Sequence, residues 1–462
     1  MTAARELLHA YEAGLGVPTS ALADEPDPGA RLAATLPVWA LAAGSVGAVQ
    51  AAANRLRATR GVPDVPIRLD PDRIAAAFAS ERLMRHHDAA PQVFAALSGF
   101  FPTADGWVRT HANYPHHRDR LAAVLDLPAD ATAEQVRARL RTTAAADIET
   151  AAAPAGAIAV RVRTEAEWAG SPMGRAAAAG PLVTVDRRDH AATRPRAAGD
   201  PPITWPERHA PSSPAPLRGL RVLDLTRVLA GPVATRTLAL LGADVLRVDP
   251  PRLPEIDWQF LDTCQGKRST LLDLRTDLAS FETLLDAADV LVTGYRPGAL
   301  AAAGVRTVGC PDLIEASVSA WGTTGPWGDR RGFDSIVQAA SGISLLEGSA
   351  DRPGALPAQA LDHGSGYLLA AGVIDALAAR AGDGLGRTVR VSLARTASWL
   401  LAAGGRDPGH PEPAAPSPAA TVSHGATTTA APALVGYDDY RWPAPPYGSA
   451  QPFWIDAASL RH

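Results

Sequence analysis

Short apolar runs and helical patterns alternate between residues 217 and 403. Five of the runs have the length of buried strands: 220–225, 243–248, 270–274, 290–292 and 314–318. The pattern over 233–241 predicts a helix between the first two runs, which Gly242 can end. Strands that alternate with helices favour a parallel sheet with right-handed crossovers. We therefore predict an α/β fold in which 217–403 form a Rossmann-like domain with a parallel sheet.

Proline-rich stretches divide the rest of the chain. Because proline lacks a backbone donor and disfavours helix in the residue before it, we interpret 197–216 as a linker. It separates an N-terminal region, 1–196, from the domain at 217–403, and 404–462 form a Pro/Ala-rich tail. The uncharged run over 32–53 is long enough to span a membrane. Its many alanines and glycines are weakly hydrophobic, so a buried helix is favoured and a membrane span is the alternative.

Composition and charge exclude several classes. The 462 residues carry a net charge of −4, which argues against a protein that binds nucleic acid by bulk electrostatics. The two cysteines, Cys264 and Cys310, exclude a disulfide framework and a cysteine-only metal site. The chain does not open on a basic stretch followed by an apolar run, so we expect no signal peptide and a reducing, cytoplasmic location. Five histidines cluster in sequence without a fixed spacing of acids or cysteines, so we expect no metal site; they are His86, His87, His111, His116 and His117.

The first turn of the predicted sheet has the outline of a nucleotide-binding unit. Asp249 follows the second strand, where such units carry a ribose-binding acid. The turn over 226–232 holds one glycine, Gly231, where three are needed for the backbone to approach a pyrophosphate. A scaffold role is therefore favoured over NAD or FAD binding, and we expect no permanently bound cofactor.

Two small-residue segments are weakly alike. Residues 36–55 can be laid over 361–380, which sets Pro37 against Asp362 and ends both segments in arginine. The match is short and low in complexity, and chance explains it equally well. If the repeat is real, one copy alone carries a carboxylate at this position.

Residues 217–400 resemble the family III CoA-transferases, which include formyl-CoA transferase, carnitine CoA-transferase and the α-methylacyl-CoA racemases. The motifs follow the family's order: LRGLRVLDL (217–225), VLAGP (228–232), LGADV (241–245), GKRS…LDL (266–274), RPG (296–298), WGTTGP (321–326) and GFD…QAASG (332–342). The resemblance implies a CoA-binding domain and a smaller α+β domain, to which parts of 105–173 correspond. The order of the halves is then rearranged: 1–196 are a degenerate rear half, and 421–454 a C-terminal remnant.

By the same resemblance, Asp362 is the catalytic carboxylate, in the segment ALDHGSG before a small-residue helix. In the family this aspartate attacks an acyl-CoA and becomes an aspartyl-CoA thioester, from which the acceptor acid takes CoA. Free amides and the dipole at a helix N-terminus stabilise a carboxylate anion, and the small residues at 364–366 leave room for a thioester. The alternative is that Asp362 is an N-cap, which is worth about 1 kcal/mol.

The resemblance further implies the residues that contact coenzyme A, which is a substrate here. They are Leu229, Ala230, Leu272, Leu274, Arg275, Gly294, Tyr295, Arg296 and Arg331. For Arg275 and Arg331 a solvated surface charge is an equally good interpretation. Lys267 and Arg268 could contact phosphates, but pinning of their loop is favoured. Ala302 stands where a CoA-binding arginine is usual, which could weaken phosphate binding.

The leading hypothesis is a CoA-transferase that exchanges CoA between an acyl-CoA and a carboxylic acid, as an interlocked homodimer without nucleic-acid or membrane partners. A non-catalytic CoA-binding partner subunit is the second hypothesis, because of Ala302 and the reordered halves. An acyl-CoA racemase or isomerase is the third. Phe333 occupies the place of the racemases' catalytic histidine, and His363 could substitute only if it faced the same way as Asp362, whereas adjacent residues at a helix start usually diverge.

Overall fold

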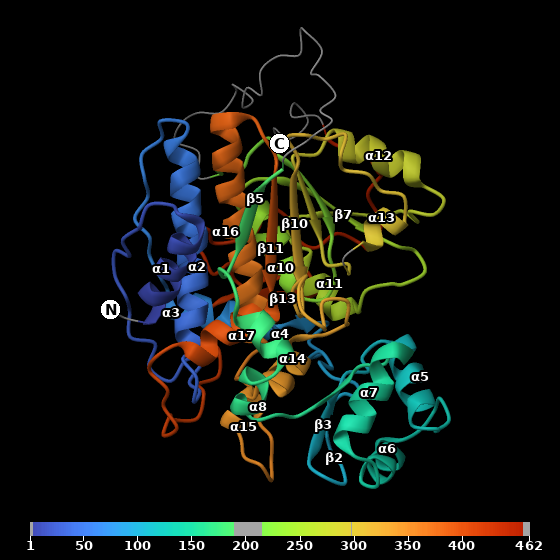
Figure 1. The fold of residues 1–462 in the computed structure, drawn as a ribbon. Coiled ribbons are helices and arrows are strands. Elements are labelled where there is room, and N and C mark those ends of the chain that lie inside the picture. The colour runs from blue at the N-terminus through green and yellow to red at the C-terminus, as the bar shows by residue number, and fades with distance from the viewer. Residues whose placement is uncertain (1–2, 189–214, 297, 456–462) are drawn as a thin grey trace.

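The structure is a computed structural model that describes residues 3–188, 215–296 and 298–455. The predicted linker over 197–216 lies outside the described residues, apart from its last two positions. The described chain forms a main body, built on a seven-stranded sheet, and a small lobe at the lower right of Figure 1.

The main sheet confirms the predicted α/β class. Its order is β5-β11-β10-β9-β6-β7-β8, and every neighbouring pair is parallel except β5 with β11. The strands are β5 (Thr184–Arg187), β6 (Arg221–Leu225), β7 (Asp244–Asp249), β8 (Arg268–Leu271), β9 (Val290–Thr293), β10 (Ile314–Ser319) and β11 (Arg387–Ser392). Five of them match the predicted runs. The run over 270–274 is shifted, because β8 ends at Leu271 and leaves Leu272 and Leu274 in the loop behind it.

Alternate strand residues face two apolar cores, one on each side of the sheet. Val222, Val245 and Val290 pack into the core that also holds α10 (Ala230–Leu240) and α16 (Ala360–Asp383). On the other face, Leu223 and Leu246 pack with α12 (Leu278–Asp286). A parallel sheet that is covered on both faces reads as continuous apolar runs, which is why its strands could be recognised in the sequence.

Helix α16 lies beside α2 (Val38–Ala58) in the main body, orange next to blue in Figure 1. Helix α2 is buried along most of its length and is covered by α1 (Ala3–Leu15), which confirms the buried helix predicted for the uncharged run. Among the described residues, no helix is both long and apolar enough to cross a membrane.

The packed helices suggest another register for the internal repeat. The pattern Leu-Pro-x-x-Ala-Leu-x-x-Gly-Ser occurs at 36–45 and again at 356–365. This register sets Ala42, rather than Pro37, against Asp362, and it sets Arg55 against Asp375. Arg55 donates to both carboxylate oxygens of Asp375, at 2.7 and 2.9 Å. Equivalent positions of two related helices meet when the pair is packed about a local twofold axis.

The likeness continues past both helices. After α2, Ile67 makes a parallel bridge and Asp70 caps α3 (Pro71–Phe78) through the amides of its first turn. After α16, β11 leads into Ser392, which caps α17 (Leu393–Ala402) in the same way. The N-terminal region therefore carries two helices joined through an isolated β-bridge, an order that parallels the helix–strand–helix unit around Asp362.

The small lobe has its own antiparallel sheet and core, as the predicted smaller α+β unit requires. Its strands are β2 (Phe100–Pro102), β3 (Trp107–Thr110) and β4 (Ala159–Arg161), and its helices are α5 (Pro115–Val124), α6 (Ala133–Leu140) and α7 (Ala145–Ala155). Strand β3 also packs against α14 (Asp334–Ser341) of the main body, so the lobe contacts the helix that follows the GFD motif.

The segment after residue 403 packs onto the main body. Strands β12 (Thr421–His424) and β13 (Thr427–Ala430) form a small sheet with β1 (Arg85–His86). The Ala450 amide donates to the Ser269 carbonyl behind β8 at 2.7 Å. The other helices are α4 (Ser80–Leu83), α8 (Glu165–Ala169), α9 (Pro172–Ala178), α11 (Asp257–Thr263), α13 (Ala299–Ala302) and α15 (Ile343–Leu346).

Candidate active site

The N-terminus of α16 is capped by a carboxylate from another helix. Asp334, the first residue of α14, accepts the backbone N–H groups of Leu361 and Asp362 with one oxygen, at 2.9 and 3.0 Å. Its other oxygen accepts the side-chain amide of Gln338. Asp362 is the third residue of α16, and its own side chain makes no hydrogen bond to the described residues. Asp362 is therefore not the N-cap, because Asp334 performs that role.

Asp362 and Asp334 form a buried pair of carboxyl groups. Asp334 is fully buried and Asp362 is 5% exposed. Burial, and then the charge of Asp334, hold the pKa of Asp362 well above its ordinary value. Burial raises the pKa of Asp334 to about 6, against the lowering effect of its three donors. The expectation that free amides keep Asp362 ionised is wrong, because Asp334 already takes those amides.

The small residues after Asp362 serve helix packing rather than ligand access. A Cβ on Gly364 would meet Leu41 of α2 at 2.8 Å, and one on Gly366 would meet the carbonyl of Ala230 in α10 at 2.6 Å. Ser365 is hydrogen-bonded to Thr396 of α17 at 2.8 Å. These residues do not leave the open space that we expected for a thioester, but they bring the start of α10 against the first turns of α16.

His363 is fully buried and lies with its ring 5.3 Å from that of Phe78 in α3. Burial lowers its pKa to about 3, so the ring is neutral at physiological pH. Neither ring nitrogen has a partner in the described part of the chain. His363 makes its ring contact with the N-terminal region, in agreement with the expected divergence from Asp362.

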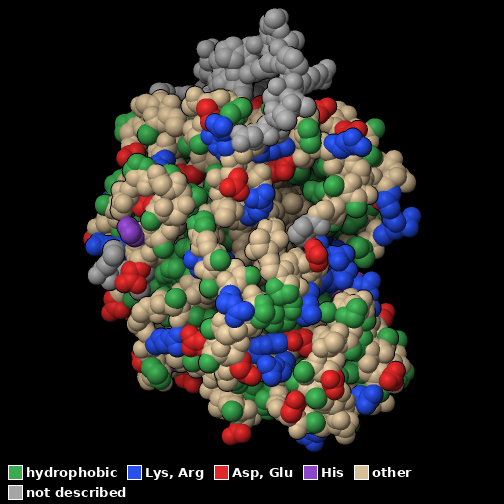
Figure 2. Space-filling model, in the orientation of Figure 1, with side chains coloured by type: hydrophobic (Ala, Val, Ile, Leu, Met, Phe, Trp, Pro, Cys, Tyr) green, Lys and Arg blue, Asp and Glu red, His purple; other side chains and the backbone are tan. Residues whose placement is uncertain are grey.

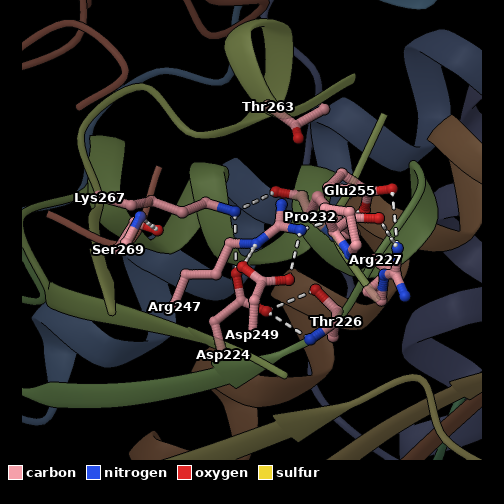
Figure 3. A network of polar contacts seen from close by, with 12 residues as sticks. Asp224, Thr226, Arg227, Pro232, Arg247, Asp249, Glu255, Thr263, Lys267 and Ser269 are labelled. Atoms are coloured by element: carbon pink, nitrogen blue, oxygen red, sulfur yellow. Dashed lines mark hydrogen bonds and ion pairs between the residues drawn. The ribbon is translucent and has the colours of Figure 1, made fainter. Parts of the chain in front are cut away.

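The turn before α10 is held in a strained conformation. Val228 has φ of 71°, a left-handed conformation that β-branched residues rarely adopt. Its N–H donates to Glu255 at 2.9 Å, and Glu255 also accepts the hydroxyl of Tyr114, from the small lobe, at 2.6 Å. Arg247 bonds the same carboxylate at 3.1 Å. The buried network of Figure 3 thus fixes the turn that places Leu229 and Ala230 beside α16.

Lys267 anchors the underside of the same turn, as Figure 3 shows. Its ammonium is fully buried and donates to Asp224 at 2.9 Å, to Thr235 at 2.6 Å and to the carbonyl of Pro232 at 3.0 Å. Arg268 pairs with Asp244 on the neighbouring strand. The favoured interpretation is confirmed for Lys267, which pins the turn and is closed to a phosphate.

The predicted CoA contacts fall into two groups in space. Leu229 and Ala230 are buried against α16. The second group lines cavities along the carboxyl ends of the strands. A cavity of about 350 Å³ is lined by four predicted residues, which are Leu272, Leu274, Arg275 and Tyr295. Tyr295 also borders a cavity of about 420 Å³ that reaches Arg296. Gly294 is exposed at the end of β9.

A smaller cavity lies between the lobe and the main body. It has about 120 Å³ and is lined by Arg296, Arg331 and residues of β4. The Arg331 and Arg120 guanidiniums both lie close to Gly156 in the lobe. Burial, and then the charges of Arg296 and Arg120, lower the pKa of Arg331. Within the described ranges, none of these three arginines pairs with a carboxylate, unlike Arg275, which pairs with Asp273. In Figure 2, blue side chains gather where the lobe meets the body.

Sequence reasoning missed the residues that the lobe brings to Asp334. The ring of His111 stacks on that of Phe333 at 3.7 Å, and His117 meets the same ring at 5.9 Å. The buried guanidinium of Arg109 lowers the pKa of Asp334. No spacing links these residues to Asp334 in the sequence, because they come from another region. Their location in β3 and shortly after it is the one local signal. Among the described residues, no group of three or more His, Cys, Asp or Glu side chains could hold a metal.

Comparison with known proteins finds similarity over residues 217–427. The model of CoA-transferase family III matches residues 217–427. The chain is 35% identical over 212 residues to the probable fatty acyl-CoA transferase Rv3272 of Mycobacterium tuberculosis, which covers 41% of this chain and 54% of the relative. It is 36% identical over 165 residues to the succinate–glutarate CoA-transferase of Agrobacterium fabrum, covering 30% of this chain and 41% of that protein.

A third relative is the formyl-CoA:oxalate CoA-transferase of Streptomyces avermitilis, 33% identical over 196 residues, with 38% of this chain and 47% of the relative covered. A crystal structure of Rv3272 aligns with a TM-score of 0.39 at 35% identity, over 41% of this chain and 56% of that one. The chain thus spans about half the length of the curated relatives it matches. The matched segment begins before β6 and includes Asp334 and Asp362, and over residues 217–427 the chain is therefore similar to CoA-transferase family III.

Proposed function

We propose that the protein transfers CoA from an acyl-CoA to a carboxylic acid, with Asp362 as the nucleophile. The observation that supports this most is the buried carboxyl pair at the start of α16, where Asp334 holds the backbone of Asp362 and leaves the Asp362 side chain unbonded. A structural cap would be engaged with amides, whereas a nucleophile needs free oxygen lone pairs.

The reaction needs four balanced steps. A carboxylate oxygen of Asp362 attacks the thioester carbon of the acyl-CoA, which releases CoA thiolate and forms a mixed anhydride. The thiolate attacks the aspartyl carbonyl, which releases the first acid and leaves aspartyl-CoA. The carboxylate of the second acid then attacks aspartyl-CoA, and the freed thiolate takes the new acyl group from the resulting anhydride. Asp362 is regenerated as a carboxylate, and the cycle consumes no net proton.

The protonation of the carboxyl pair sets the pH range of the first step. Attack requires ionised Asp362, but burial and the neighbouring charge favour its protonated form in the closed site. Asp334 keeps the negative charge more easily, because two backbone amides and Gln338 donate to it. We therefore expect the rate of the first half-reaction to rise with pH, through the pKa of Asp362.

Coenzyme A fits the groups along the strand ends. The cavity at Leu272, Leu274 and Tyr295 offers apolar walls for a base. The unpaired arginines, Arg120, Arg296 and Arg331, offer charge for phosphates. Arg120 is supplied by the small lobe, and it adds a cation to a site in which Ala302 replaces the usual arginine. The relatives' names indicate that different acids serve in different members, so the acid itself is not assigned.

Exchange of labelled CoA between an acyl-CoA and free acids tests the proposal. The variant Asp362→Asn keeps the shape of the side chain and should lose exchange at least about a thousandfold, with CoA binding unchanged by calorimetry. Full exchange in this variant would remove the mechanism. CoA binding without exchange in the wild-type protein would favour the non-catalytic partner subunit instead.

One observation favours a racemase as the second candidate. His111 stacks on Phe333, the residue that stands at the place of the racemases' catalytic histidine, and so returns an imidazole to that neighbourhood. Its pKa is lowered to about 3, by burial first, which makes it a weak base. Solvent deuterium that enters the α-carbon of an acyl-CoA, and stops doing so in His111→Gln, would support this candidate; no incorporation would exclude it.

We further propose the interlocked homodimer that the family resemblance implies, in a reducing compartment where Cys264 and Cys310 stay as free thiols. Analytical ultracentrifugation decides the first point. A monomer that carries full exchange activity would contradict it.

A further inference from the structure

The small lobe contains a buried cation without a partner. Arg109, in β3, is 8% exposed. Its Nε atom is sealed from solvent, and the guanidinium makes no hydrogen bond or ion pair to the described residues. Burial lowers its pKa to about 10, so the group is still charged at neutral pH. An unpaired charge is unfavourable in a protein interior, so its position calls for an explanation.

Two aromatic rings hold the guanidinium in place. Its carbon lies 4.8 Å from the centre of the Phe100 ring and 5.0 Å from that of Phe94. Phe100 is the direct cross-strand partner of Arg109 in the β2–β3 pair, so the contact follows from the register of the sheet. Rings attract a cation but offer its N–H groups no acceptor in their plane. The guanidinium group of Arg109 is thus fixed in orientation, and its N–H donors are still available.

Further unpartnered polar atoms lie close by. His111 follows β3 and His117 lies in α5, and the Nδ1 atom of each ring is buried without a partner. Both rings contact Phe333, the residue before Asp334. Both pKa values are about 3, with burial as the first cause, so the rings are neutral. Three side chains with unused hydrogen-bonding atoms therefore gather beside the cap of α16.

The carboxylate of Asp334 does not serve as the missing partner. It acts on Arg109 electrostatically, but its two oxygens are already bonded to the amides of α16 and to Gln338, and no ion pair joins it to Arg109. The guanidinium therefore has unused donors near Asp334, in a region that the α14–β3 contact places against the helix whose first residue caps α16.

We propose that Arg109 binds the carboxylate of the acid substrate, with His111 and His117 lining the same subsite. A guanidinium fork matches a carboxylate in geometry and binds it bidentately. This inference rests on the proposed function for its place in the reaction, and it adds that the N-terminal half of the chain supplies the group that recognises the acid.

Arg109→Met tests the proposal, because methionine has a similar length and packs well between aromatic rings. Arg137→Met is the matched control: Arg137 is also in the lobe and lies over a ring, that of Phe101, at 5.6 Å, but it is exposed. Removal of an unpaired buried charge should leave the melting temperature unchanged or higher. A clear fall in the melting temperature of Arg109→Met alone would indicate a structural role and overturn the proposal.

Calorimetric titration with butyrate and with glutarate measures the acid subsite directly. The wild-type protein should bind at least one of them, and Arg109→Met should raise that dissociation constant at least tenfold, with Arg137→Met within twofold of wild type. No binding of either acid by the wild-type protein, or equal binding by the two variants, would overturn the proposal.

Steady-state kinetics separate this inference from the proposed function. Arg109→Met should raise the KM for the acid while the KM for the acyl-CoA stays within about twofold. The first half-reaction needs no acid acceptor, so acyl-CoA should still modify Asp362 in Arg109→Met. Absence of that modification from the wild-type protein would contradict the proposed function. The calorimetric result tests the role of Arg109 independently of that outcome.

Discussion

Helices α2 and α16 share a sequence pattern and a place in the core, but only α16 has a carboxyl group at the position of Asp362. Asp362 of α16 is a carboxyl group whose helix start is capped by Asp334. The position that the shared pattern makes equivalent in α2 is Ala42, which is fully buried. Glu347 holds the segment just before α2, where it accepts the amides of Thr35 and Leu36 at 3.0 and 2.9 Å.

A carboxylate from elsewhere in the chain therefore holds backbone amides near both helix starts, in the first turn of α16 and just before α2, but the proposed nucleophile occurs in α16 alone. The scaffold needs small residues along the packed helix, which α2 retains. The chemistry needs one further carboxyl group, which α16 alone has. The difference indicates that the fold does not require Asp362, and that the cost of burying its carboxyl group is explained by the proposed function.

Substitutions at the equivalent positions Asp362 and Ala42 should have the largest effect. Asp362→Asn should abolish CoA exchange and raise the melting temperature at pH 7, because a carboxyl group that resists ionisation is removed. Ala42→Asp should lower stability by several kcal/mol, since it buries a carboxyl group without a partner. Activity in a protein that carries both changes would show that α2 can replace α16, against this account.

The ion pair between the helices should give the next largest effect. Arg55 and Asp375 are 15% and 6% exposed at their side chains, and Tyr11 and Glu12 of α1 join them. Asp375→Asn leaves a buried cation partly unpaired and should cost about 3 kcal/mol in the free energy of unfolding. In a double-mutant cycle with Arg55→Met, denaturant titrations should show a coupling of about 1–3 kcal/mol. A coupling free energy near zero would contradict a direct interaction between Arg55 and Asp375, the equivalent positions of the two helices.

Removal of the cap on α16 should have a smaller effect on stability and a distinct effect on activity. Asp334→Ala leaves the amides of Leu361 and Asp362 buried without an acceptor, which costs about 1–3 kcal/mol for each group, but it also removes a buried carboxyl group with a raised pKa, which offsets part of that cost. It also removes the neighbouring charge, so the pKa of Asp362 should fall and the pH profile of the first half-reaction should move to lower pH. Asp334→Asn, which keeps an acceptor, is the control for the cap. If the pH profile of the first half-reaction were unchanged in both variants, the electrostatic interaction between Asp334 and Asp362 would be contradicted.

The pH dependence of stability is the finest test. A carboxyl group whose pKa is raised by folding binds its proton more tightly in the folded state, so its contribution is present at pH 4 and is lost as pH rises through its folded pKa, about 6 for Asp334. A shift of this size corresponds to about 3 kcal/mol. The stability gain of Asp362→Asn should thus be small at pH 4 and grow towards pH 7. A gain that is independent of pH would indicate a packing effect instead. Glu81, with a pKa raised to about 7, mainly by burial, titrates in the same range and makes Glu81→Gln the background control.

Local signals predicted the main sheet well and the active site in part. The strands that are buried on both faces, such as β6 and β7, were readable as apolar runs, and the motif order located Asp362. Strand β5 has four residues, two of them exposed, so it carries no such run. Its place on the sheet follows from the chain's return past α9, which no local pattern encodes.

The surroundings of Asp362 could not be read from the sequence, because they are made by residues far away in the chain. The glycines at 364 and 366 looked like space for a ligand, yet Leu41 and Ala230 occupy that space. No pattern in the sequence marks Arg109, which the lobe places in the interior near Asp334. Nor does the sequence alone show that Asp334 accepts the backbone amides at the start of α16. Because of burial and of this neighbouring carboxylate, the pKa of Asp362 is raised, whereas a lowered pKa was expected.

Covalent trapping tests the central claim most directly. The wild-type protein is incubated with acetyl-CoA or butyryl-CoA, treated with hydroxylamine and digested, and the peptide that contains Asp362 is measured by mass spectrometry. The account predicts a hydroxamate on Asp362 that forms only with acyl-CoA present and is absent from Asp362→Asn. An unmodified peptide in a protein that still exchanges CoA, or a hydroxamate on another carboxyl group, would contradict it.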